Sequence, residues 1–365
     1  MMKKPKAKKL MKAIAITLSA MLVMSALLIT AVGFVYPAIL RAQHRIDTSN
    51  GIDQMENVRI GGVYQALYFR GQDIQNPVIL FIHGGPAYPT MPFLHTFQFP
   101  WEDYFTIVHW DQRNAGRTFF LNDPQEVFET LSFDRMVQDA YEITHHIREV
   151  LDKDQIAIMG YSWGSAIGTA LVQTYPQYFN GYIAVGQTIN RDLSRPVAFA
   201  ALLEAARQGG NDRHISQIEA LESWAGYPWS GALTGEIRQW QARYGQANTG
   251  SDLRAILDIM TSPYYSVRDK TYFMRNFQRW STPLGGGTFN ARDFGDVYSV
   301  PVFYIMGVRD FQTPYPVARD FFDEIIAPHK GFFSIPDASH DVFRENHEEL
   351  TRVLIEEIRP VLTDQ

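Results

Sequence analysis

Residues 155–172 read Gln-Ile-Ala-Ile-Met-Gly-Tyr-Ser-Trp-Gly-Ser-Ala-Ile-Gly-Thr-Ala-Leu-Val. The apolar run 155–159 predicts a buried strand, and residues 166–172 predict the start of a helix. Between them, Gly160 to Gly164 match Gly-x-Ser-x-Gly, the sharp strand-to-helix turn called a nucleophile elbow, which would expose the hydroxyl of Ser162. A Cβ at Gly160 or Gly164 would collide with the neighbouring strand or helix. An ordinary Gly/Ser turn would fit the same pattern, so the motif needs support from elsewhere in the chain.

The N-terminus carries the pattern of a membrane anchor. Residues 13–40 contain no charged side chain, and about 20 apolar residues span a hydrocarbon core. Six lysines within residues 1–12 precede this run, so the positive-inside rule keeps this basic tail in the cytoplasm and places the rest of the protein outside. A cleavable signal peptide is the alternative, but its apolar region is normally about 7–15 residues long. We therefore expect an uncleaved single-pass signal anchor, followed by a polar linker over residues 41–57.

Composition excludes several classes of function. Outside residues 1–12 the chain has 27 basic and 39 acidic side chains, a net charge of −12, which argues against a surface that binds nucleic acid. The chain has no cysteine, which excludes a thiolate nucleophile and a Cys-ligated metal. Its histidines and carboxylates show no metal-ligand spacing, so we expect neither a metal nor another cofactor.

Apolar runs of strand length alternate with stretches of helical periodicity. The runs cover residues 77–82, 104–109, 181–185, 300–306 and 330–335, and the helical stretches include residues 131–151 and 342–358. Residues 58–71 predict two further short strands joined by a Gly-Gly turn. This alternation predicts an α/β fold, with a mainly parallel sheet and helices on both faces. Such sheets bind ligands at the carboxyl ends of their strands.

Residues 189–297 interrupt the alternation. We expect several helices there, at residues 195–208, 214–221, 235–244 and 252–260. We interpret the segment as a helical cap over the site, inserted between two parts of the core at residues 58–188 and 298–365. A second domain with its own core would show a similar aromatic content.

Three polar residues that follow predicted strands could form a catalytic triad. A serine hydroxyl needs a base to take its proton, and a carboxylate must hold the imidazole of that base. Ser162, Asp310 and His340 occur in the chain order Ser, acid, His that accompanies this type of elbow. Other acids and histidines suit these roles less well. Asp293, Asp296 and Asp320 do not directly follow a strong strand. His83 and His109 precede the serine, and His145 and His146 lie on the predicted helix 131–151.

Two backbone N–H groups could stabilise the negative charge of a tetrahedral intermediate. Trp163, the residue after the serine, would supply one. The loop His83-Gly84-Gly85-Pro86 would supply the other, and Gly85 is our candidate. An ordinary strand-ending turn is the alternative interpretation of this loop.

Five short motifs identify a family. They are His83-Gly84-Gly85-Pro86, Asp111-Gln112-Arg113, Gly160-Tyr161-Ser162-Trp163-Gly164-Ser165, Gly307-Val308-Arg309-Asp310 and Ser339-His340. Over about residues 58–188 and 298–365 the chain resembles the proline iminopeptidase-like branch of the α/β-hydrolase superfamily, a group of serine peptidases and related hydrolases. The resemblance implies the α/β-hydrolase fold, the triad and oxyanion hole named above, and a cap over the pocket. Ala87 and Asn114 stand where the family usually has glycine.

The resemblance favours an aminopeptidase that releases N-terminal residues, proline above all, from short peptides. Together with the predicted anchor and triad, it leads us to expect a membrane-anchored serine hydrolase that works through an acyl-enzyme. Such an enzyme must pair the ammonium group of its substrate with a carboxylate, because an unpaired buried charge is costly. The candidate acids lie in the cap, with Glu204 preferred: Glu204, Glu219 and Glu222. A carboxylesterase for small acyl esters needs no such acid. A carbon–carbon hydrolase or haloperoxidase-like activity would also fit the same triad, and a catalytically silent binding protein would fit the same scaffold.

Overall fold

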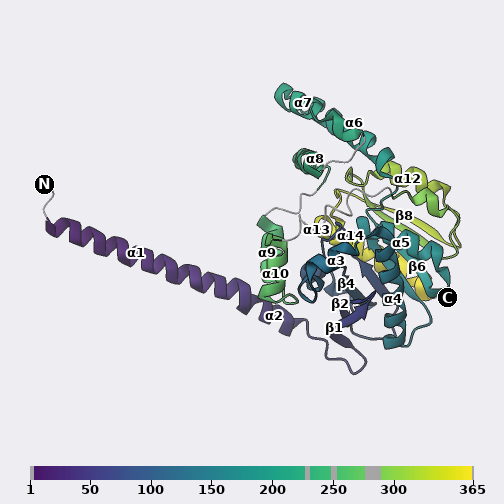
Figure 1. Ribbon diagram of the computed structural model, residues 1–365, viewed down its shortest axis with the longest axis horizontal. Coiled ribbons are helices and arrows are strands. Elements are labelled where there is room, and N and C mark those ends of the chain that lie inside the picture. Colours follow the sequence, from purple (N-terminus) through teal and green to yellow (C-terminus); the bar gives the residue numbers. More distant parts are fainter. Residues whose placement is uncertain (1–3, 227–230, 248–252, 276–288, 364–365) are drawn as a thin grey trace.

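An eight-stranded sheet forms the centre of the protein (Figure 1). The computed structural model describes residues 4–226, 231–247, 253–275 and 289–363. The strands are β1 (Ile52–Ile60), β2 (Val63–Gly71), β3 (Val78–Ile82), β4 (Thr106–Asp111), β5 (Ile156–Tyr161), β6 (Phe179–Val185), β7 (Val302–Gly307) and β8 (Lys330–Ile335). Their order across the sheet is β1-β2-β4-β3-β5-β6-β7-β8. Strands β3 to β8 pair in parallel, whereas β2 is antiparallel to both β1 and β4, which confirms the predicted mainly parallel sheet.

The central strands are apolar throughout because helices cover both of their faces. Successive side chains of a strand point to opposite faces, so Leu80 and Ile82 belong to one core and Ile79 and Phe81 to the other. The first core is completed by α4 (Phe133–Leu151), α5 (Trp163–Thr174) and α12 (Tyr315–Glu324). The second is completed by residues 91–105 and by the C-terminal helices α13 (Val342–Glu345), α14 (His347–Arg352) and α15 (Arg359–Thr363).

The C-terminal segment departs from the single helix expected over residues 342–358. The helix is interrupted at Asn346, whose backbone leaves the helical region and whose side chain instead caps α14 by accepting from Glu349 N at 3.3 Å. Residues Val353–Ile358 then form a π-helical stretch before α15. Asparagine favours such caps because its side chain competes for backbone N–H groups.

Strand β1 begins at Ile52, inside the stretch 41–57 that we expected to be a linker. Ile52 pairs with Gly71 of β2, and Asp53 forms an ion pair with the buried Arg70 at 3.0 Å. The strand lies at the edge of the sheet, where Gln54, Asn57 and Arg59 are exposed. Its polar composition therefore suits an edge strand and lacks the apolar run that marks a buried strand.

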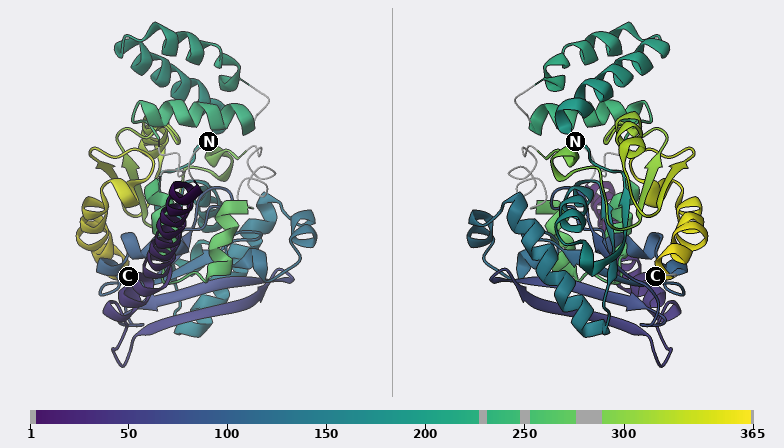
Figure 2. Two further views of the ribbon diagram at one scale, coloured as in Figure 1. Left: turned by 90° about the vertical axis from the view of Figure 1, so that its left-hand side faces the viewer. Right: turned by 90° about the vertical axis from the view of Figure 1, so that its right-hand side faces the viewer.

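The segment that we expected to form a cap consists of helices between β6 and β7. They are α6 (Arg191–Gln208), α7 (Asp212–Glu219), α8 (Gly231–Arg243), α9 (Leu253–Thr261) and α10 (Val267–Arg275). Helices α6, α7 and α8 stand over one end of the core (Figure 2) and share a small apolar cluster that includes Leu202, Ile218 and Ile237. Helix α10 was not expected from the sequence. The cap predicted over residues 189–297 also includes positions 276–288, which lie outside the described residues.

The N-terminal segment is a single long helix that projects away from the rest of the protein (Figure 1). It comprises α1 (Lys4–Thr30), a π-helical turn at Ala31–Val35 and α2 (Tyr36–Gln43). Its stretch Lys8–Gln43 is 36 residues long, and the most apolar part of it is not buried in the protein. By length and composition this helix could cross a membrane, and a signal sequence has the same properties.

Candidate active site

The elbow at the end of β5 places Ser162 in a strained backbone conformation. Its φ of 52° and ψ of −119° lie outside the regions that L-residues prefer, at a cost on the order of 1–3 kcal/mol. Helix α5 begins at the next residue, Trp163. A Cβ on Gly160 would lie 2.7 Å from the Gly164 oxygen, and one on Gly164 would lie 2.7 Å from the His83 oxygen. The two glycines therefore allow the tight turn and its close approach to β3.

The structure brings Ser162, His340 and Asp310 together from three strand ends. Ser162 Oγ lies 2.9 Å from His340 Nε2, and His340 Nδ1 lies 2.8 Å from Asp310 Oδ2. Ser162 and His340 are nearly buried, and Asp310 is fully buried. A hydroxyl that donates to an imidazole, which in turn donates to a carboxylate, is the geometry of a nucleophile activated by a general base.

The carboxylate of Asp310 is fixed by its own loop. Its Oδ1 accepts hydrogen bonds from the N–H groups of Gln312 at 2.8 Å and Thr313 at 2.9 Å. The Thr313 hydroxyl donates to Oδ2 at 2.9 Å. These three bonds fix the orientation of the carboxylate and aim Oδ2 at the imidazole.

Gly186, directly after β6, makes room for the imidazole. It has a φ of +60°, and a Cβ there would lie 3.0 Å from His340 Cε1. On the other side of the ring, Tyr161 is tilted against His340 with the ring centroids 5.3 Å apart. Its hydroxyl also donates to the His340 oxygen at 3.3 Å. The imidazole is therefore held between a glycine backbone and an aromatic ring.

The loop after β3 lies against the elbow. A Cβ on Gly84 would come within 3.0 Å of Ser162 Cβ. Gly85 has a φ of +119°, and a Cβ there would lie 2.7 Å from Ala87 N, so this position requires glycine. The N-terminus of α5 faces the same region, because Trp163 is its first residue. The two residues predicted to form an oxyanion hole thus lie on the two segments that flank Ser162.

The buried side chain of His83 holds the loop after β3 in place. Burial lowers the pKa of His83 to about 4, so its ring is neutral near pH 7. The ring accepts from Gln112 N through Nε2 at 3.2 Å and therefore carries its proton on Nδ1, which bonds the Gly84 oxygen at 2.8 Å. Gln112 Nε2 also donates to the His83 oxygen at 2.8 Å. His83 and Gln112 consequently tie the ends of β3 and β4 together.

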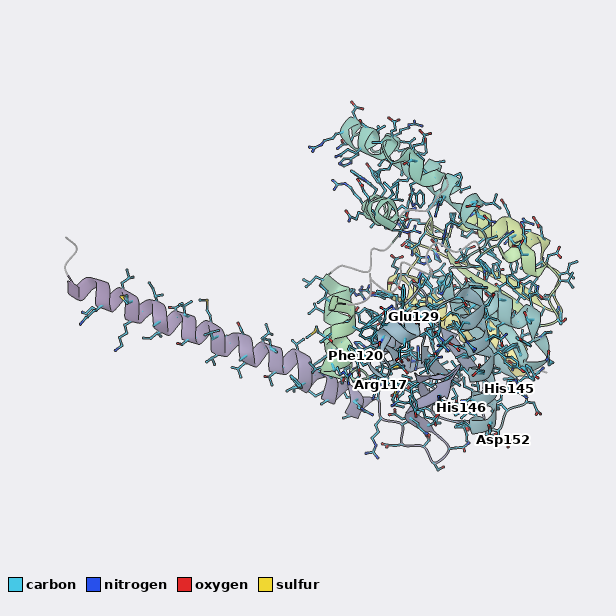
Figure 3. All side chains as sticks on the ribbon, in the orientation of Figure 1. Arg117, Phe120, Glu129, His145, His146 and Asp152 are labelled. Carbon is cyan, nitrogen blue, oxygen red and sulfur yellow. The ribbon has the colours of Figure 1, made fainter. Side chains whose placement is uncertain are left out.

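The rival histidines lie outside this arrangement. Burial lowers the pKa of His109 to about 3, and its Nε2 bonds Gln98 at 2.5 Å. His145 and His146 lie on α4, on the side of the core away from α6 to α8 (Figure 3). His146 bonds Glu56 of β1 at 2.8 Å. These side chains support the core and do not contact Ser162.

Asp111 connects the end of β4 to the cap. Its Oδ2 accepts from Arg117 N at 2.7 Å and from the hydroxyl of Tyr265, just before α10. Burial raises the pKa of Asp111 to about 7. Helix α10 is held further by Arg117, which pairs with Asp269 at 3.5 Å, and by Phe120, whose oxygen accepts from Arg268. Figure 3 labels Arg117 and Phe120 at the foot of α10.

The cap acids proposed for an ammonium site are not brought to Ser162. Glu204 is exposed on α6, where its Oε1 accepts from Gln208 at 3.0 Å. Glu219 is exposed and pairs with Arg207 at 3.4 Å. Glu222 is also exposed. All three carboxylates are solvated, as acids on helix surfaces usually are.

Helix α8 instead contacts the loop that carries Asp310. Gln241 Nε2 donates to the Phe311 oxygen at 2.9 Å, and Arg238 Nη2 donates to the Gln312 oxygen at 3.1 Å. Burial lowers the pKa of Arg238 to about 10, although the nearby Asp310 opposes this effect. The described part of the cap therefore brings a positive charge to the acid loop.

Among the described residues, no group of three or more histidine, aspartate or glutamate side chains could hold a metal ion.

Several residues that shape the site were not predicted from the sequence. Gly186 and Thr313 had detectable signals, a glycine directly after a strand and a hydroxyl three residues after the acid. Gln241 had none, because its partner Phe311 is distant in the sequence.

Known proteins are similar to this chain in sequence. The family described as alpha/beta hydrolase fold matches residues 77–346. A protein of Bacillus subtilis (strain 168), named probable aminopeptidase YbaC, is 26% identical over 302 residues, which cover 81% of this chain and 93% of that protein. A proline iminopeptidase of Neisseria gonorrhoeae is 29% identical over 148 residues, or 40% of this chain and 43% of that protein. The resemblance drawn from the sequence motifs is thereby confirmed.

Solved structures with different activities share the fold. The crystal structure of proline iminopeptidase from Mycobacterium smegmatis has a TM-score of 0.52 at 18% identity, and the match covers 85% of this chain and 99% of that one. A thermophilic esterase from Thermogutta terrifontis has a TM-score of 0.53 at 17% identity, with coverage of 85% and 100%. These similarities show the fold and leave the substrate open. The family match extends over most of the chain and includes the segments that carry the predicted site, so the chain belongs to the alpha/beta hydrolase fold family and is a hydrolase.

Proposed function

We propose that the protein is a serine hydrolase that works through Ser162, His340 and Asp310 and a covalent acyl-enzyme. The observation that carries the proposal is the hydrogen-bonded chain of 2.9 Å and 2.8 Å that links these three side chains. Asp310 would hold the His340 ring with its proton on Nδ1, which leaves Nε2 free to accept the proton of Ser162.

In this mechanism Ser162 Oγ attacks the substrate carbonyl while His340 takes its proton. The imidazolium then gives that proton to the leaving amine or alkoxide as the tetrahedral intermediate collapses to the acyl-enzyme. Water then attacks the acyl carbonyl while it gives a proton to His340. The second tetrahedral intermediate collapses as His340 returns that proton to Ser162 Oγ and the acid leaves, so that Ser162 is regenerated. Every step uses groups of this chain, and no cofactor is required.

The N–H groups of Gly85 and Trp163 would bind the oxyanion of each tetrahedral intermediate. This role is supported by the positive φ of Gly85 and by the position of Trp163 at the start of α5, where helix N–H groups are free to donate. Loss of one oxyanion donor typically costs about 10²–10³ in kcat.

For the substrate, we propose short peptides from which the N-terminal residue, proline above all, is released. The support is the naming of the relatives as aminopeptidase and proline iminopeptidase. The ammonium site would then use a carboxylate other than the solvated Glu204, or Glu204 after a rearrangement of α6.

One observation favours a second candidate, a carboxylesterase of small acyl esters. The three cap acids face solvent, whereas Arg238 brings a positive charge to the acid loop. An ester substrate has no ammonium group to neutralise, so it needs no carboxylate in the cap.

Two measurements test these proposals. A fluorophosphonate probe should label the wild type and not Ser162→Ala; an unlabelled wild type would favour a silent binding protein.

Hydrolysis is then compared for a free-amine prolyl arylamide, its N-acetylated form and a short acyl ester. Preference for the free amine supports the aminopeptidase. Equal cleavage of the acetylated amide, or cleavage of the ester alone, rejects it.

We also propose that residues 13–40 anchor the protein in a membrane, with residues 1–12 in the cytoplasm and the catalytic core and cap outside. The support is the exposed apolar helix and the lysines that precede its apolar run. The protein should fractionate with membranes, and protease added from outside should digest the catalytic part. Recovery of a soluble form that starts near residue 42 would show a cleaved signal peptide instead.

A further inference from the structure

Helix α9 carries an exposed apolar stripe. Its members recur at helical spacings of three and four residues and are Leu253, Ile256, Leu257 and Met260, which we call the α9 stripe. Their exposed fractions run from 37% for Met260 to 71% for Leu253. At 100° per residue these side chains fall within one arc of about 100°.

The opposite side of α9 already has its packing partners. Ala255 and Ile259 are buried in the second core of the protein. The α9 stripe is therefore not the face that holds the helix to the core. Contiguous exposed apolar surface of this kind marks an interaction site.

Helix α9 lies beside the N-terminal helix, which we proposed as the membrane anchor. The helix lies against Ala31–Val35, the π-helical turn of the N-terminal helix (Figure 1). There Val32 and Gly33 are partly covered, while Phe34 and Val35 remain exposed. This turn belongs to the uncharged run 13–40 and precedes Arg41 by 6–10 residues, or about 9–15 Å along a helix.

The dimensions match a bilayer surface. An uncharged run of 28 residues is about 42 Å long as a helix, whereas a hydrocarbon core is about 30 Å thick. The turn at Ala31–Val35 would therefore lie near the outer edge of that core. Interfacial helices bury their apolar face about 5–10 Å into this layer, which is the depth that α9 would reach.

We propose that the α9 stripe inserts into the outer surface of the same lipid bilayer that holds the N-terminal helix, as a second membrane contact made by the cap. The inference rests on the proposed anchor and goes beyond it. This membrane contact would be linked to the site through α10. Lys270 Nζ of α10 bonds the Met260 oxygen of α9 at 2.8 Å, and the Tyr272 hydroxyl of α10 bonds the Ala87 oxygen, in the loop after β3, at 2.9 Å. The contact would thus hold the part of the cap that bonds Ala87 close to the membrane.

The absence of cysteine makes a direct test possible. Single variants Leu257→Cys and Ile256→Cys report on the stripe, Leu22→Cys on the anchor, and Val150→Cys on an exposed apolar position of α4 as the matched control. Each full-length variant carries an environment-sensitive fluorophore and is reconstituted into phosphatidylcholine vesicles. Quenching is measured with a lipid that bears a nitroxide on its acyl chain and with aqueous iodide.

We expect the labels at Leu257, Ile256 and Leu22 to shift to shorter emission wavelength and to lose intensity with the nitroxide lipid, while the label at Val150 responds to iodide alone. If Leu22 responds to the lipid and both stripe positions respond to iodide, the α9 inference fails and the anchor stands. If the stripe labels are shielded from both quenchers, a protein surface covers the stripe and the inference also fails. If Leu22 responds to iodide, the anchor itself fails, and the inference with it.

Discussion

Gln241 of the cap donates a hydrogen bond from Nε2 to the backbone oxygen of Phe311, the residue next to Asp310, at 2.9 Å. Gln241 is fully buried, and its Oε1 accepts from Arg238 Nη1 at 2.5 Å. In return, Phe311 N donates to the Gln246 oxygen at 3.0 Å. The cap therefore contributes directly to the position of the acid loop, in addition to covering the core.

This contact predicts that Gln241→Ala lowers kcat without removing any group from the triad. An unpaired buried carbonyl costs about 1–3 kcal/mol, and relaxation of the loop would move Asp310 relative to His340. We expect kcat to fall by about tenfold, which corresponds to about 1.4 kcal/mol. The control is Gln239→Ala, an exposed position on the same helix. Equal kcat in the two variants would show that the cap does not position the acid.

Asp310→Asn should lower kcat by about 10⁴, because an amide leaves the imidazole in the wrong tautomer. The fold should persist, since Gln312 and Thr313 can still donate to the amide oxygen. Kinetics and circular dichroism of Asp310→Asn are compared with those of Asp320→Asn, which changes an exposed acid on α12. Nearly normal turnover in Asp310→Asn would assign the acid role to another residue.

Gly186→Ala should impair catalysis through His340. The new Cβ would lie 3.0 Å from His340 Cε1, so the ring would have to shift from the position in which it bonds Ser162 and Asp310. Gly210→Ala is a matched control, because Gly210 has a similar φ of +66° and no atom within 4 Å of the added Cβ. Both variants should lose about 1–2 kcal/mol of stability from backbone strain.

Only Gly186→Ala should lose activity, by about 10² or more in kcat, because small misplacements of a catalytic group have effects of this size. Thermal unfolding measures the shared strain, and kcat measures the specific clash. Parallel losses of activity in the two variants would mean that strain alone is responsible.

The strand ends could be predicted from the sequence because the central strands are buried on both faces and read as uninterrupted apolar runs. Each run stops where the chain leaves the sheet, and Ser162, Asp310 and His340 follow three such ends. Their order in the chain then suggested their roles. The structure places the three side chains within hydrogen-bonding distance of one another.

The parts that could not be predicted depend on contacts between distant segments. Strand β1 is polar because it lies at a sheet edge, and its start at Ile52 is set by pairing with Gly71. Helix α10 is held in place by two contacts: the Tyr272 hydroxyl donates to the Ala87 oxygen, and Asp269 forms an ion pair with Arg117. Such partners leave no periodic pattern in the sequence of the helix itself.

The stability of the protein should depend on pH through Asp111. Burial raises the pKa of Asp111 from 3.8 to about 7 in the folded protein. Between these values the folded protein keeps a proton that the unfolded chain has lost. This proton therefore stabilises the fold fully below about pH 4, and its contribution is lost as the pH rises through about 7.

Asp111→Asn should remove this dependence, because the amide oxygen can still accept from Arg117 N and the Tyr265 hydroxyl while carrying no charge. The free energy of unfolding of the wild type, minus that of Asp111→Asn, should fall between pH 4 and pH 7 by up to about 1.4 kcal/mol per pH unit. Urea denaturation of both proteins in detergent micelles measures the difference, and other titrating groups cancel from it. A difference that stays constant over this range would show that Asp111 is already ionised in the folded protein. A difference that rises with pH would show that the folded carboxylate is stabilised and that its pKa is lowered.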